Sequence, residues 1–194
     1  MRLEYPEGAT PIDPEELASL IPSLTTQAEL NEFEALNIAE AVDWAYRSRI
    51  VKRGVLDRDV LSLLHKRMFD KTWLWAGKYR QTAKNLGMET WCIPAEIQTL
   101  VIDTRHWIEH TTYDPNELIA RFHHRLVSIH PFLNGNGRHA RLAADLLCPQ
   151  IGCPLPTWGS SDQSNSTDVR SKYINALRRA DCHEMQSLVK FLRS

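Results

Sequence analysis

Helix start signals recur along this 194-residue chain and constrain its fold more than any other feature. Two segments, Asp13-Pro14-Glu15-Glu16 and Asp114-Pro115-Asn116-Glu117, each place a capping acid, a proline and then at least one further acid in the order that suits a helix N-terminus. Thr26-Gln27-Ala28-Glu29 has the spacing of a capping box, and Asp57 and Pro94 introduce further apolar stretches of helical period. We therefore expect a mainly helical chain.

Two stretches of the sequence lack the helical pattern of these segments. Residues 78–93 alternate loosely between polar and apolar and carry Gly87, a pattern that favours a small β-hairpin. Residues 149–167 are rich in Pro, Ser, Gly, Asn and Asp, which is typical of a loop. The predicted fold class is all-α with one small β-hairpin. The expected helices cover residues 14–20, 26–49, 57–68, 94–108, 114–129, 138–147, 168–180 and 184–192.

Composition excludes several classes of protein. The net charge is −1 and the sequence contains no basic stripe, so nucleic acid is an improbable partner. No run of about 18 apolar residues exists, and the first residues lack the pattern of a signal peptide, so we expect a cytoplasmic protein without a membrane partner. Cys148 and Cys153 lack the paired histidines of a zinc site and are interpreted as ordinary thiols. The expected core tryptophans are Trp44, Trp73, Trp75 and Trp91, with Trp91 also able to pin the hairpin.

The segment HPFLNGNGRHAR, residues 130–141, concentrates groups that suit an anion site. Gly135 and Gly137 flank Asn136 at a predicted helix start, where free backbone N–H groups and the helix dipole attract anions. Arg138 and Arg141 are three residues apart on that helix, so both guanidinium groups are expected on one face. His130 precedes the loop and has a side chain suited to general base catalysis.

This segment resembles the signature of the Fic family, H-x-F-x-[D/E]-G-N-G-R-x-x-R. The chain matches seven of the eight fixed positions, at residues His130, Phe132, Gly135, Asn136, Gly137, Arg138 and Arg141. The resemblance implies a core over residues 26–148. We expect an N-terminal segment with a short helix at 1–25 before it, and a loop and C-terminal helices at 149–194 that pack on the same domain. The whole chain also resembles a bacterial Fic subgroup associated with mobile genetic elements, found beside a helix-turn-helix protein.

The resemblance implies a protein nucleotidyltransferase that moves AMP from ATP to a hydroxyl group of a target protein. His130 would be the base, and Arg138 and Arg141 would act in catalysis and stabilise the leaving pyrophosphate. Residues 135–137 would bind the phosphates together with both arginines. The implied partners are a target protein docked by β-strand addition on the flap at 78–93 and a neighbouring helix-turn-helix or antitoxin protein.

Asn134 departs from the family signature, because it replaces the acidic residue that ligates Mg²⁺ in the family. A neutral amide oxygen can ligate a hard cation but lacks the charge that supplies most of the attraction. We therefore expect weaker Mg²⁺ binding at Asn134, with ATP supplying most of the ligands. Three outcomes stay open: AMP transfer, transfer of another phosphate-linked group, or a nucleotide-sensing or protein-binding scaffold without turnover.

Glu29 is a candidate inhibitory residue. Thr25 to Leu30 partly matches the family's [S/T]-x-x-x-E-[G/N] pattern, although Leu30 stands where Gly or Asn is usual. The resemblance implies that Glu29 would pair with Arg141 and stop ATP from binding productively. The alternative is structural, since the capping box beginning at Thr26 already explains the glutamate.

Overall fold

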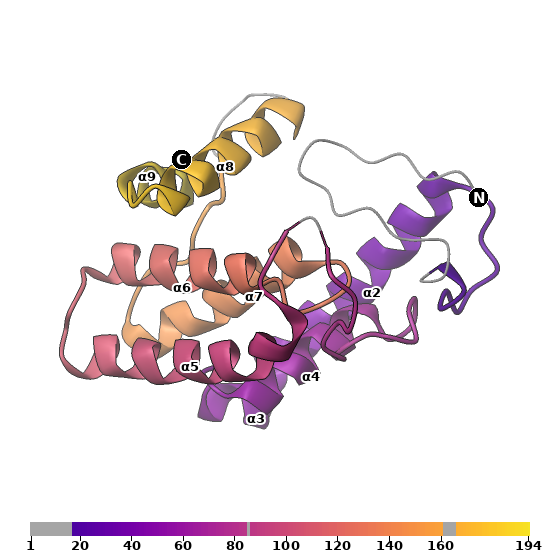
Figure 1. Ribbon diagram of the computed structural model, residues 1–194, viewed down its shortest axis with the longest axis horizontal. Coiled ribbons are helices and arrows are strands. Elements are labelled where there is room, and N and C mark those ends of the chain that lie inside the picture. Colours follow the sequence, from indigo (N-terminus) through magenta and orange to yellow (C-terminus); the bar gives the residue numbers. More distant parts are fainter. Residues whose placement is uncertain (1–16, 85, 161–165) are drawn as a thin grey trace.

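The computed structural model describes residues 17–84, 86–160 and 166–194, and it is mainly helical (Figure 1). Helices α5 and α6 run side by side, α7 packs against α6, and the C-terminal helices α8 and α9 lie at one edge, with α9 against α6 (Figure 1). The α-helices are α2 (Gln27–Arg47), α3 (Arg49–Arg53), α4 (Arg58–Phe69), α5 (Ile93–Glu109), α6 (Pro115–Ile129), α7 (Asn136–Leu147), α8 (Ser166–Asp181) and α9 (Gln186–Leu192), and two 3₁₀ turns are η1 (Thr90–Cys92) and η2 (Cys148–Ile151).

Seven of the eight predicted helices are confirmed, and each begins within two residues of its predicted start. Thr26 caps α2 and forms the complete capping box with Glu29. Asp57 and Asp114 cap α4 and α6 by accepting hydrogen bonds from backbone N–H groups. Helix α7 begins at Asn136, two residues earlier than expected, and the five-residue α3 was not predicted. The short helix expected at 14–20 falls largely outside the described residues.

The predicted β-hairpin is absent as paired strands in the described part of 78–93, which instead forms a loop ending in η1. Two of its backbone N–H groups donate hydrogen bonds to residues 129–131 instead of to a partner strand of a hairpin. The Arg80 N–H donates to the Pro131 carbonyl at 2.9 Å, and the Met88 N–H donates to the Ile129 carbonyl at 3.3 Å. The segment therefore lies against residues 129–131, and we call residues 78–93 the flap loop.

The core is formed where α2, α4, α6 and α7 meet. Trp73, Phe122 and Phe132 are almost completely buried there, and Trp75 is also buried. The predicted core position of Trp91 is wrong, because 79% of this residue, which lies on the flap loop, is exposed. No helix in the described ranges is both long and apolar enough to cross a bilayer.

Candidate active site

His130 ends α6 and starts the loop that leads to α7. Its backbone is left-handed, with φ 52° and ψ 59°, which turns the chain sharply at this residue. Gly135, with φ 77°, occupies the N-cap of α7. A side chain at Gly135 would put its Cβ 2.4 Å from the Phe69 ring, so glycine is required there for both conformation and space. The predicted helix, loop and helix arrangement is thus present.

Asn136 holds the loop closed through its side-chain amide. Its Oδ1 accepts from the Phe132 N–H at 2.9 Å, and its Nδ2 donates to the Phe132 carbonyl at 2.8 Å. Only 3% of Asn136 is exposed. The amide predicted to hold phosphates is therefore occupied by the loop itself, and the backbone N–H groups at the start of α7 are left as the anion donors.

A buried group of rings supports this loop. The His65 ring stacks on Phe132 with centroids 3.7 Å apart, and His139 meets Phe132 edge-on at 5.1 Å. Gly77 N–H donates to His65 Nδ1 at 3.0 Å, so the proton sits on His65 Nε2, which donates to the Asn134 carbonyl at 3.0 Å. His65 was not predicted as a site residue, because an isolated histidine on α4 has no motif around it.

His130 lies in a buried environment with cationic neighbours. Burial lowers the pKa of His130 to about 4, helped by the nearby charges of Arg80 and Lys84 and opposed by a hydrogen bond to the Val127 carbonyl. His130 is buried, with 8% of the residue exposed. A pKa below 7 keeps the imidazole neutral at physiological pH, the state that a general base needs.

Arg80 fixes the flap loop to His130. The Arg80 Nε donates to the His130 carbonyl at 2.7 Å, Nη1 donates to Thr82 at 3.0 Å, and Nη2 donates to the Met88 carbonyl. Gly87 then packs directly on the histidine: a Cβ at Gly87 would lie 2.5 Å from His130 Cβ. Arg80 was not predicted as a site residue, although its place at the end of the aromatic stretch WLWAGKYR was a signal.

Arg138 lies on the side of the loop that faces α2 and α4. Its Nη1 donates to Glu34 Oε2 at 2.6 Å, and its guanidinium carbon lies 5.0 Å from the Phe69 ring centroid. The Arg138 side chain remains 44% exposed, so part of the guanidinium faces outward. The Glu34 partner was not expected from sequence.

Arg141 contacts a different part of the fold, on the side of α8. Its guanidinium carbon lies 4.3 Å from the Tyr173 ring centroid and 5.5 Å from that of Trp158. Its charge also acts on Asp145, whose pKa burial raises to about 6 against the effects of Trp158 and Arg141. The two motif arginines therefore contact different elements instead of forming the single face that the sequence indicated.

Asn134 does not form a metal site with acidic neighbours. Its Oδ1 accepts from the Gly135 N–H at 2.6 Å. Within the described ranges, no cluster of three or more His, Cys, Asp or Glu side chains could hold a metal ion. The residues present fit Mg²⁺ poorly, and an ion here would depend on the phosphates of a nucleotide for most of its ligands.

Glu29 belongs to the capping box at the start of α2. Its Oε2 accepts from the backbone N–H groups of Thr25 and Thr26 at 2.7 and 3.0 Å, and from the Thr25 hydroxyl at 3.0 Å. These hydrogen bonds lower the pKa of Glu29. Among the described residues, no hydrogen bond or ion pair joins Glu29 to Arg141. The inhibitory role of Glu29 stays a prediction.

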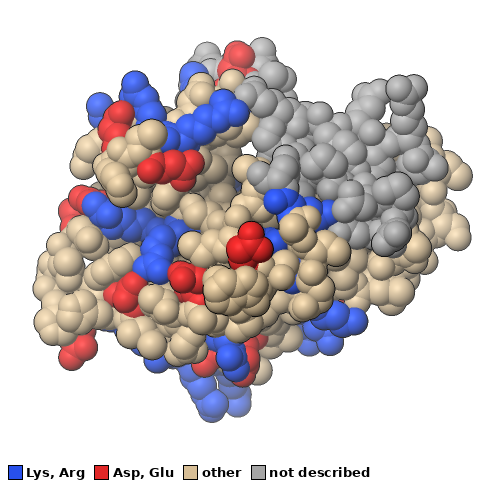
Figure 2. Space-filling view, in the orientation of Figure 1, with Lys and Arg blue, Asp and Glu red and all other residues tan. Residues whose placement is uncertain are grey.

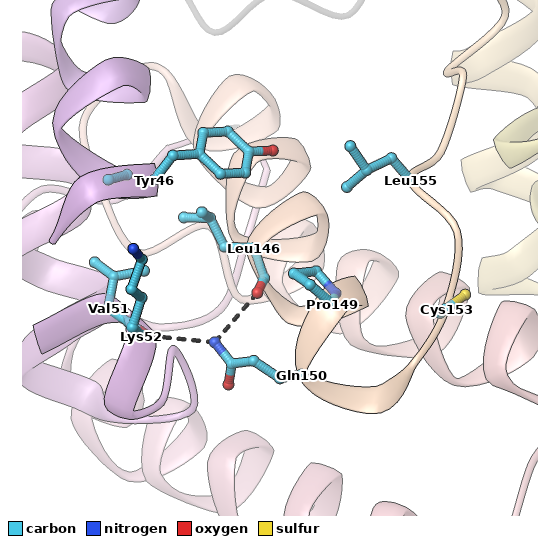
Figure 3. Close-up of a pocket in the computed structure, with 9 residues that line it drawn as sticks. Tyr46, Val51, Lys52, Leu146, Pro149, Gln150, Cys153 and Leu155 are labelled. Carbon is cyan, nitrogen blue, oxygen red and sulfur yellow. Dashed lines mark hydrogen bonds between the residues drawn. The ribbon is translucent and has the colours of Figure 1, made fainter. Parts of the chain in front are cut away.

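A surface pocket of about 520 Å³ lies away from this loop, at the other end of α7 (Figure 3). Leu146, Pro149 and Gln150 line it beside Tyr46 and Lys52. Because a 12-residue helix is about 18 Å long, this pocket is separate from His130. Charges of both signs are intermingled on the face shown in Figure 2, with no single-sign stripe in that view.

Comparison with known proteins finds matches over the part of the chain that contains the loop at 130–141. Residues 55–148 match the model of the Fic/DOC family. "Protein adenylyltransferase Fic" of Drosophila grimshawi is 26% identical over 162 residues, and its counterpart in Drosophila melanogaster is 28% identical over the same length. Each alignment covers 82% of this chain and 32% of the relative, so the chain spans about a third of these relatives' length.

Solved structures share the fold at lower sequence identity. The BepC protein of Bartonella tribocorum, solved with bound AMPPNP, has a TM-score of 0.68 and 20% identity, with 93% of this chain and 98% of that chain covered. The N-terminal Fic domain of a Bartonella effector protein from Bartonella sp. AR 15-3 has a TM-score of 0.70 and 13% identity, with 93% and 92% covered. These similarities confirm the predicted helical fold.

Proposed function

We propose that this chain, whose residues 55–148 match the model of the Fic/DOC family, transfers AMP from ATP to a hydroxyl side chain of a target protein. One observation carries the proposal. A histidine whose pKa is held near 4 stands at the entrance of a glycine loop that opens a 12-residue helix. A neutral base beside free backbone N–H donors is the arrangement that transfer to a hydroxyl group needs.

In the proposed reaction, His130 takes the proton from the target hydroxyl as its oxygen attacks the α-phosphorus. The new oxygen–phosphorus bond forms while the bond between the α-phosphorus and the bridging oxygen breaks, and pyrophosphate leaves. The N–H groups at the start of α7 and the guanidinium of Arg138 stabilise the negative charge on the phosphates. Arg141 acts from the far side of the loop, where it contacts Tyr173.

The flap loop is the proposed docking site for the target. The N–H groups of Arg80 and Met88 already donate to residues 129–131, so strand addition has fewer free donors than a hairpin would offer. Exposed apolar side chains on the flap loop, at Leu86, Met88 and Trp91, supply a surface for a target segment beside His130. Target recognition by side chains is therefore part of the proposal.

Asn134 favours a second candidate, a Fic scaffold that binds nucleotide and signals to a protein partner without turnover. Asn134 stands at the position of the family's acidic metal ligand, and its amide oxygen already accepts the Gly135 N–H. Less metal assistance means less stabilisation of charge in the transition state. The two candidates share nucleotide binding and differ only in chemistry.

A transfer assay with two differently labelled nucleotides tests the proposal. The full chain is incubated with ATP labelled at the α-phosphorus or at the γ-phosphorus, and protein-bound label is measured on the chain itself and on added cell extract. AMP transfer incorporates only the α label. His130→Ala should abolish it, while His110→Ala, an exposed histidine at the end of α5, should not change it. Incorporation of the γ label, or an active His130→Ala variant, contradicts the proposal.

A further inference from the structure

Glu34 is the one acidic residue buried in the described part of the protein, with 6% of it exposed. It lies on α2, a helix with no part in the glycine loop. The stripe of α2 that faces the core includes Leu30, Ala41 and Ala45, so this position would ordinarily hold an apolar side chain. Removing a carboxylate from water costs free energy that an apolar residue would not cost. A buried carboxylate at this position therefore indicates a role for Glu34 beyond packing.

Both oxygens of the Glu34 carboxylate are engaged. Oε1 accepts from the Trp73 indole N–H at 2.7 Å, and Oε2 accepts from Arg138 Nη1 at 2.6 Å. Trp73 is 1% exposed and stacks on Trp75 with centroids 5.1 Å apart, so the indole is held in place. The position of the carboxylate is thus fixed by a rigid donor before Arg138 is considered.

Arg138 is held from two directions. Glu34 takes one guanidinium nitrogen, and the Phe69 ring lies against the group, with 5.0 Å from the guanidinium carbon to the ring centroid. The same Phe69 ring contacts Gly135 at the N-cap of α7. Nε and Nη2 of Arg138 make no hydrogen bond to any described residue, and the side chain is 44% exposed. The donors left over are available to a ligand at the loop.

We propose that Glu34 is a positioning residue, which together with Trp73 holds the Arg138 guanidinium beside the glycine loop for the β- and γ-phosphates of a nucleotide. This inference rests on the proposed function, because it needs a phosphate ligand at the loop. A guanidinium that is already oriented loses less side-chain freedom when it binds phosphate, which strengthens binding. Glu34 acts through Arg138 and need not touch the ligand.

The test measures the affinity of the full chain for two probes, a non-hydrolysable ATP analogue and inorganic tripolyphosphate, in wild type and variants. Glu34→Gln keeps the shape but has one acceptor oxygen for two donors, so the contact with Trp73 or with Arg138 is lost. We expect about tenfold weaker binding of both probes, the loss of roughly one charge-assisted hydrogen bond. An equal loss for tripolyphosphate, which has no base or sugar, locates the effect at the phosphates.

Two further variants keep the test decisive. Glu40→Gln removes an exposed carboxylate of the same helix, which pairs with Lys71, and should leave both affinities unchanged. Trp73→Phe removes the indole N–H but keeps an aromatic ring, and should weaken both probes by about threefold, since one of the carboxylate's two contacts is lost. If Glu34→Gln does not fold, as judged by thermal unfolding, Trp73→Phe decides the outcome.

The outcomes separate the inference from the proposed function. Arg138→Ala should weaken both probes strongly. Unchanged or tighter binding in Glu34→Gln, with Arg138→Ala still weakened, overturns the positioning role, and tighter binding would show that Glu34 competes with phosphate. If wild type binds neither probe, or Arg138→Ala binds as wild type does, the nucleotide site itself is wrong and the proposed function fails with it.

Discussion

Replacing Gly87 with alanine should disturb the contact between the flap loop and His130. Gly87 has φ 96°, and an added Cβ would lie 2.5 Å from His130 Cβ and 2.8 Å from Arg80 Nη2. The left-handed backbone costs an alanine about 1–2 kcal/mol, and crowding in a packed site adds about 1–3 kcal/mol. Gly87→Ala should therefore lower the free energy of unfolding by about 2–5 kcal/mol, with the lower values applying if the loop shifts.

Gly152→Ala provides a matched control for this variant. Gly152 has φ 67°, but an added Cβ meets no atom within 4 Å, so only the backbone cost of about 1–2 kcal/mol remains. Urea unfolding compares the two variants, and the AMP transfer assay should show reduced activity only for Gly87→Ala. Equal stability losses together with equal activities would refute the packing of Gly87 on His130.

Three other predictions concern the loop and its histidines. Asn136→Ala should lower the free energy of unfolding by about 2–3 kcal/mol in urea, because two hydrogen bonds inside the buried loop are lost; the exposed Asn31→Ala should change it by less than about 0.5 kcal/mol. Arg80→Met should raise the pKa of His130, because the positive charge of Arg80 helps to lower it, and should move the acidic limb of the pH–rate profile to higher pH. Arg80→Lys keeps the charge and should leave that limb in place. An unmoved limb in Arg80→Met contradicts the role of this charge. Burial lowers the pKa of His139 to about 4 in the folded state, so the unfolded chain binds a proton first as the pH falls. The free energy of unfolding should therefore decrease below about pH 6.5, by about 2 kcal/mol at pH 5 for this residue. If His139→Gln shows the same pH dependence as wild type in urea unfolding, this role of His139 is wrong.

Helices were predictable because their signals are local. The capping box at Thr26 and the caps at Asp57 and Asp114 appear in the structure as the sequence indicated. The β-hairpin was not predictable, since the backbone N–H groups of Arg80 and Met88 donate to Pro131 and Ile129, which lie 51 and 41 residues further along the chain, just before the glycine loop. Alternation alone cannot distinguish a strand from a loop held by such tertiary contacts.

The candidate site was predictable in its residues and less so in their contacts. The glycine loop, His130 and Arg138 were named from the motif, but a motif cannot say that the Asn136 amide turns inward onto Phe132. Glu34 was missed because an acid on α2 is ordinarily a surface residue. The spacing of Leu30, Glu34 and Asn37 on the buried stripe of α2 was the available signal, and it required knowing which face of the helix is buried.

A calorimetric titration of the chain with a non-hydrolysable ATP analogue, with and without Mg²⁺, is the most direct test of the proposed nucleotide site, because it needs no target protein. We expect binding that Arg138→Ala weakens strongly. Arg47→Ala, which removes an exposed arginine at the end of α2, should leave binding unchanged. Binding that is absent in wild type, or equally strong in Arg138→Ala, would contradict the assignment of the loop at 130–141 as a nucleotide phosphate site.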